Sequence, residues 1–185
     1  MTAPPLREAF DAYKTETLSA VLGQAGVSAI PKTKEDKVSL WILVMPDRKR
    51  IERSLSQLTP RCRKALELLQ AAGGELRTSR FESLVGRAGL LEKQSKQKKP
   101  AERWATTRPE DAVDPATFLE VLAALVKHGL VWTHTNPAGT NAKLAFDAPG
   151  RFVIILPIVA AHLPPPPKGT ETVREVPQVL AASAR

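Results

Sequence analysis

Cysteine and aromatic residues are scarce in this chain of 185 residues. The single cysteine, Cys62, excludes a framework of internal disulfides and is typical of a protein from a reducing compartment. No histidine or aspartate stands beside Cys62 in the sequence, so we interpret it as an inert thiol rather than a nucleophile. Aromatic residues make up 5% of the chain, whereas 43% of its residues are hydrophobic. The core must therefore consist mainly of Leu, Val, Ile and Ala side chains.

Long hydrophobic segments are also lacking. Apolar runs such as residues 152–156 are far too short to cross a bilayer, which requires about 20 apolar residues. Residues 1–7 do not show the charged and then apolar order of a signal peptide. We expect a cytoplasmic protein with no membrane partner.

Motifs for catalysis and for metal or cofactor binding are missing as well. The histidines, His128, His134 and His162, are scattered, and none stands at metal-ligand spacing from a cysteine or carboxylate. The glycines form no phosphate-binding loop of the GxxxxGK[ST] type. Paired carboxylates at residues 35–36 and 110–111 are better explained as charges near helix N-termini than as acid–base pairs. The sequence therefore predicts no catalytic residue, no metal site, no cofactor and no enzymatic activity.

Positive charge is present in excess, and it is unevenly distributed. The net charge of +8 and the pI near 9.9 favour a polyanionic partner. Residues 32–64 hold ten Lys or Arg against four acids, a balance of +6, and residues 92–108 hold six against two, a balance of +4. Residues 109–128 hold one base against four acids, a balance of −3. The basic character thus belongs to the amino-terminal half and to one loop.

The amino-terminal segment predicts two short helices joined by an extended link. The first contains residues 18–22 and ends at Gly23 to Gly26. The second has Thr33 as its N-cap and Asp36 in a capping-box position, carries apolar residues between Val38 and Val44, and is ended by Pro46. This pattern resembles the SAP motif, a helix, link and helix unit that binds DNA. The residues that carry the resemblance are Leu18, Leu22, Gly26, Val27, Lys34, Val38 and Ile42.

The lysines of this unit are the first candidate DNA contacts. Lys32, Lys34 and Lys37 lie at or near a helix N-terminus, where ammonium groups and backbone N–H groups can meet the same phosphate. An ordinary helical hairpin with these lysines in solvent is the alternative. Residues 47–58 continue as a basic helix or turn, and Arg48, Lys49 and Arg50 are either further phosphate contacts or the solvated face of that helix.

From Thr59 onward the predicted order is helix, strand, helix, loop, helix, strand, wing and strand. The first helix begins with Thr59 as cap and Pro60, a strand follows at residues 75–77, and Ser79 and Glu82 form a capping box for the next helix. Asp114 caps a helix that Gly129 ends. A strand at residues 130–134 then turns through residues 136–141 and returns at residues 144–146 and 152–155.

This order predicts an α+β chain, mainly α, and resembles a winged helix: three helices plus a small antiparallel hairpin, preceded by the SAP-like helical unit. The segments "GLV" and "FVIILP", together with the two pieces in tandem, resemble the amino-terminal region of bacterial proteins related to XPB-type DNA helicases. We expect an N-terminal helical unit at residues 1–58, a winged-helix domain at 59–159 with an insertion at 92–113, and a Pro-rich linker and tail at 160–185.

The insertion is charged and poor in apolar residues, so burial cannot offset the cost of ordering it. A disordered basic loop is one interpretation. In the other, its cations follow a phosphate backbone while Trp104 stacks on a base or a partner side chain, although Trp104 could equally anchor in the core. The candidate contacts in the loop are Lys96, Lys98, Lys99, Arg103 and Trp104.

The third helix of the winged-helix pattern is poorly equipped to read bases. Its expected outer face offers Thr117, Glu120, Ala124 and Lys127, and the wing adds only Lys143. We therefore expect a non-catalytic accessory module that binds duplex DNA without sequence preference, through the residues named above together with Lys127 and Lys143. The alternative is a protein-interaction module of a replication, repair or transcription assembly, whose low-charge face around residues 119, 121 and 124 meets a partner.

Overall fold

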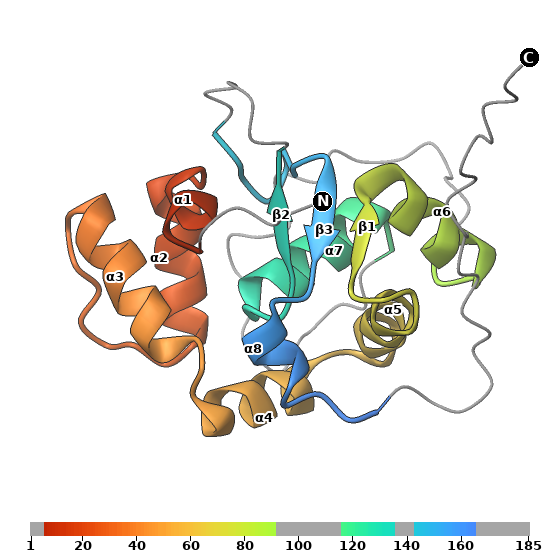
Figure 1. Ribbon diagram of the computed structural model, residues 1–185, viewed down its shortest axis with the longest axis horizontal. Helices are drawn as coiled ribbons and strands as arrows, with labels where there is room; N and C mark the ends of the chain where they lie inside the picture. Colours follow the sequence, from red (N-terminus) through yellow and green to blue (C-terminus); the bar gives the residue numbers. More distant parts are fainter. Residues whose placement is uncertain (1–5, 92–115, 136–142, 166–185) are drawn as a thin grey trace, which may run out of the picture.

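A computed structural model describes residues 6–91, 116–135 and 143–165. These residues form a mainly helical protein with one small antiparallel sheet (Figure 1). In chain order the elements are α1 (Leu6–Asp11), α2 (Thr15–Gln24), α3 (Lys34–Val44), α4 (Arg48–Gln57), α5 (Pro60–Ala71), β1 (Glu75–Arg77), α6 (Thr78–Arg87), α7 (Phe118–Lys127), β2 (Trp132–His134), β3 (Phe152–Ile154) and α8 (Pro157–Ala160). The mainly helical α+β class is therefore confirmed, and so are the predicted helix of residues 18–22 and the predicted helix between Thr33 and Pro46.

The sheet has the strand order β1-β3-β2, with both pairings antiparallel. Val153 lies in the middle of β3, between Leu76 and Thr133 of its two neighbours. The predicted strand at residues 75–77 is confirmed as β1, and β3 returns along β2 as expected.

The predicted return at residues 144–146 is wrong. Leu144 instead forms a parallel bridge with Tyr13, far from it in the sequence, and Ala145 bridges only to Ala148. The N–H of Leu144 donates to the carbonyl of Ala12 at 2.8 Å, and the N–H of Lys14 donates to the carbonyl of Leu144 at 2.9 Å. This segment is thus joined to the connection between α1 and α2, and not to β2.

Two of the predicted helix caps are confirmed and two are wrong. Thr33 and Thr59 accept hydrogen bonds from the third backbone N–H of α3 and α5. The cap of α7 is Thr117 and not Asp114, because Thr117 and Glu120 satisfy each other's backbone N–H groups in a complete capping box. Helix α6 follows β1 directly, with Arg77 as N-cap in place of Ser79.

One hydrophobic core joins the amino-terminal helices to the sheet. Trp132 of β2 is its centre, with ring centroids 4.5 Å from Phe10, 4.9 Å from Tyr13 and 5.5 Å from Trp41. Phe10 belongs to α1 and Trp41 to α3, and Tyr13 lies in the short connection between α1 and α2. Residues on both sides of position 58 therefore share one core, and the division into units at 1–58 and 59–159 stays a prediction.

Helix α7 runs through the middle of the molecule (Figure 1). It packs against α5, α2 and α6 and leads into β2. Its side chains at six positions are buried, and these are Phe118, Val121, Leu122, Ala123, Leu125 and Val126. Among the described helices, none is long and apolar enough to span a membrane.

Candidate nucleic-acid interface

Arg50 is a structural residue, contrary to the sequence-based expectation of a phosphate contact. Its side chain is only 3% exposed, and the guanidinium lies 5.1 Å from the centre of the Trp41 ring. Nη1 donates to the carbonyl of His128 at 3.0 Å, and Nη2 donates to the carbonyl of Met45 at 2.9 Å. Burial lowers the pKa of Arg50 to about 10, which leaves it charged at neutral pH. Buried in this way, the guanidinium cannot reach a phosphate.

The lysines at the start of α3 lie in three different environments. Lys32 is exposed, Lys34 is half-buried, and Lys37 is only 7% exposed. The ammonium of Lys34 donates a hydrogen bond to the carbonyl of Asp11. Lys37 is therefore largely covered and was wrongly expected at the surface, whereas Lys32 and Lys34 remain available to an anion.

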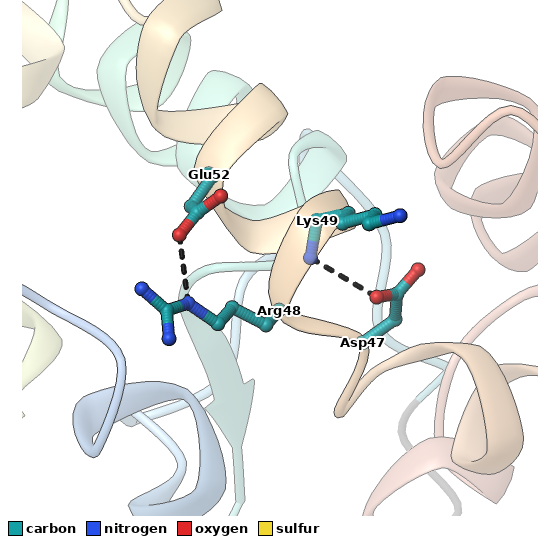
Figure 2. Close-up of polar contacts among 4 residues, drawn as sticks. All are labelled: Asp47, Arg48, Lys49 and Glu52. Atoms are coloured by element: carbon teal, nitrogen blue, oxygen red, sulfur yellow. Dashed lines mark hydrogen bonds and ion pairs between the residues drawn. The ribbon is translucent and has the colours of Figure 1, made fainter.

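The start of α4 carries acids as well as bases. Figure 2 shows that Oδ1 of Asp47 accepts a hydrogen bond from the N–H of Lys49 at 3.0 Å, and that Nε of Arg48 donates to Oε1 of Glu52 at 2.8 Å. Asp47 thereby caps the helix. Lys49 and Arg48 are exposed as expected, but the two carboxylates beside them reduce the local positive potential.

The outer face of α7 is less open than a base-reading helix requires. The side chain of Glu120 accepts the N–H groups of Ala116 and Thr117 within the capping box, and Lys127 is half-buried. Val121 is fully buried, so it cannot belong to a low-charge face that meets a partner. Leu119 is 42% exposed and can belong to such a face. The loop candidates Lys96, Lys98, Lys99, Arg103 and Trp104 lie outside the described residues.

Three lysines from three separate segments line one cleft. They are Lys14 before α2, Lys34 at the start of α3, and Lys143 before the bridge of Leu144 to Tyr13. The cleft is about 340 Å³, and Tyr13, Thr15 and Glu16 complete its wall. Sequence reasoning selected Lys34 and Lys143 but missed Lys14. Its only signal was its place before a helix, because the bridge that brings residue 143 beside it has no local sequence pattern.

Tyr13, which lines the cleft, is held by hydrogen bonds to Thr133 of β2. The hydroxyl of Tyr13 accepts a hydrogen bond from the N–H of Thr133 at 2.8 Å and lies 2.8 Å from Oγ1 of the same residue. Burial raises the pKa of Tyr13 to about 12, and its hydrogen bonds to Thr133 act in the opposite direction. The phenol is therefore neutral at physiological pH, and its hydrogen bonds to Thr133 hold the residue directly before Lys14 against β2.

Titratable groups elsewhere give little support to catalysis. Nε2 of His134 is 3.6 Å from Oε1 of Glu75, and its ring stacks on Phe152 with centroids 5.1 Å apart. His128 is half-buried, and burial, followed by the positive charges of Lys127 and Arg50, lowers its pKa to about 4. Within the described ranges, no group of three or more His, Cys, Asp or Glu residues is arranged to hold a metal ion.

Comparison of the chain with protein-family models, with curated proteins and with solved structures found no match.

Proposed function

We propose that this protein is a non-catalytic accessory module that binds duplex DNA through phosphate contacts, without reading base sequence. The observation that carries the proposal is the position of its cations. Exposed Lys and Arg side chains lie on α4, α5 and α6 and on the segments before α2 and α3, and the chain as a whole has a net charge of +8. Lys and Arg contacts to phosphates supply most of the affinity of sequence-independent binding.

A winged-helix arrangement of residues 60–156 is part of this proposal. Its support is the element order α5, β1, α6, α7, β2 and β3, together with the strand order β1-β3-β2. Helices α2 and α3 with their connecting segment are the corresponding candidate for the SAP-like unit. In helix-turn-helix proteins the second helix of the motif presents polar side chains to base edges in the major groove. Here α2 and α5 cover much of α7, which favours backbone contacts over base readout.

The proposal is tested by fluorescence anisotropy with two unrelated duplexes of the same length, titrated at several salt concentrations. We expect binding to both with equal affinity, and an affinity that falls linearly with the logarithm of salt, with a slope of about −0.9 for each phosphate contact. Absence of binding at about 50 mM salt would refute the function, because non-specific binders are strongest at low salt. A clear preference for one duplex would refute sequence independence.

A second candidate, a protein-interaction module, is favoured by one specific observation. Leu43 of α3 is 75% exposed, so α3 presents a large apolar side chain to solvent. Under this alternative, Leu43→Ser would abolish binding to a protein partner. It would leave DNA binding unchanged, because Leu43 carries no charge.

A further inference from the structure

We propose that the cleft of Lys14, Lys34 and Lys143 is the point at which the protein holds a phosphate of the DNA backbone. This inference rests on the proposed function and assigns it a location. The three lysines belong to segments separated by 19 and 108 residues of sequence, yet they line the same cleft. Convergence of this kind concentrates positive potential in a way that scattered surface lysines do not.

The cleft is held in shape before any ligand arrives. Lys14 and Lys143 adjoin the two residues of the parallel bridge, Tyr13 and Leu144, which hydrogen bonds on both sides secure. The ammonium of Lys34 uses one of its three hydrogens on the carbonyl of Asp11, which leaves two for a phosphate oxygen. Because the backbone beside Lys14 and Lys143 is already ordered, binding of a phosphate costs the conformational entropy of the lysine side chains but not that of the backbone.

The charges that line the cleft favour an anion. Glu16 is the one acid among the lining residues, against three lysines, so the local balance is +2. Lys14 and Lys143 are exposed, and within the described part of the chain neither forms an ion pair. Their charges are therefore available to a phosphate.

The cleft and the cations of α4 lie at opposite ends of α3. Helix α3 has 11 residues, and a helix rises 1.5 Å per residue, so its two ends lie roughly 15 Å apart. A single phosphate cannot contact both. We therefore assign the anchoring contact to the cleft, where no carboxylate of the described residues forms an ion pair with the lysines, and not to α4, where Glu52 pairs with Arg48.

The test compares two sets of substitutions that remove equal charge. The first is Lys14→Gln, Lys34→Gln and Lys143→Gln. The matched control is Arg77→Gln, Arg87→Gln and Arg151→Gln, three exposed cations outside the cleft. Binding of a duplex of about 20 base pairs is measured by anisotropy as a function of salt. The cleft set should weaken binding at least tenfold and reduce the salt slope by about 0.9, the value of one phosphate contact, whereas the control set should leave the slope nearly unchanged. Equal weakening by the two sets would overturn the proposal.

Two further measurements keep the proposal testable if the triple variant folds poorly. Glu16→Gln removes the one acid of the cleft and should raise the affinity for DNA; unchanged or lower affinity would contradict the assignment.

Titration with inorganic phosphate, followed by NMR at the amides of Thr15 and Glu16, distinguishes the source of the phosphate. Shifts with duplex only, or with both ligands, support the site, and shifts with neither overturn it. If the wild-type chain binds no DNA but shows these shifts with phosphate, the proposed function fails and the anion site stands.

Discussion

Arg50 connects α3 and α4, which are consecutive in sequence, to the end of α7, which is distant from both. It lies in α4, its guanidinium packs over Trp41 of α3, and it donates to backbone carbonyls at the end of α3 and at the end of α7. Gly129 makes this approach possible. Its φ of +63° lies in the left-handed region, and a Cβ there would come within 2.6 Å of Cζ2 of Trp41 and 2.9 Å of Nη1 of Arg50. Glycine is therefore required at this position for two independent reasons.

Replacing Arg50 with methionine tests this role. The substitution leaves the carbonyls of Met45 and His128 without their donors in a buried environment, so we expect a loss of about 3 kcal/mol in the free energy of unfolding. Urea denaturation followed by tryptophan fluorescence measures it. Arg48→Met, two residues earlier on the exposed side of the same helix, is the matched control and should change stability by no more than about 0.5 kcal/mol. Similar effects of the two substitutions would contradict the structural role of Arg50.

His128 makes stability depend on pH. Its folded-state pKa of about 4 lies below the ordinary value of 6.5, so between these values the unfolded chain binds the proton and the folded chain does not. Stability from this residue is therefore complete above pH 6.5, declines as the pH falls toward 4, and changes no further below 4. Urea midpoints at pH 7 and pH 5 should differ more for the wild type than for His128→Gln. An identical difference in both proteins would show that the imidazole is not responsible.

At the scale of single elements, α7 begins with the best-defined cap in the molecule. Thr117 accepts from the N–H of Glu120 at 3.3 Å, and the carboxylate of Glu120 accepts from the N–H of Thr117 at 3.0 Å. Because α7 is buried against α5 and α2, fraying of its first turn would disturb the core around Phe118.

Thr117→Ala should therefore destabilise the protein by about 1 kcal/mol, the usual cost of losing a threonine N-cap. Thermal unfolding followed by circular dichroism provides the measurement. Ser79→Ala is the control, since a serine that resembles a cap in the sequence does not cap α6 in the structure, and its effect should stay within about 0.5 kcal/mol. A larger effect of Ser79→Ala than of Thr117→Ala would contradict this assignment of the caps.

Local patterns in the sequence were sufficient to predict most helices and the strand pairing of β3 with β2, because apolar periodicity and turn residues are encoded within a few positions of each other. Caps were predicted less well where two candidates compete, as at Asp114 and Thr117. The burial of Arg50 could not be predicted, since a charged residue adds nothing to an apolar pattern and one of its carbonyl partners, His128, is 78 residues away. Lys14 escaped notice for the same reason, because the bridge of Tyr13 to Leu144 is purely tertiary.

At the scale of the whole molecule, the shared core makes the amino-terminal helices and the sheet mutually dependent. Trp132 loses three aromatic neighbours if residues 1–58 are absent, and α7 loses the cover of α2. A fragment of residues 59–165 would then expose apolar side chains that the full chain buries. Exposing apolar side chains that are normally buried removes hydrophobic stabilisation, and small domains have little stability to lose.

We expect the fragment of residues 59–165 to show no cooperative thermal transition, whereas the full chain unfolds in one step. Circular dichroism and tryptophan fluorescence should give coincident transitions for the full chain, because Trp41 and Trp132 report on the same core. A fragment that unfolds cooperatively at the same temperature as the full chain would show instead that residues 59–165 fold independently.

The hydrogen bonds between Tyr13 and Thr133 can form only late in translation, because the two residues are far apart in the sequence. The two residues are 120 positions apart, and a ribosome that adds about 5 to 20 residues per second needs about 6 to 24 s to make the second after the first. During this interval α1 and α2 have no β2 on which to pack. The contacts of Phe10 and Tyr13 with Trp132 of β2 are therefore completed only after nearly three quarters of the 185 residues have been translated.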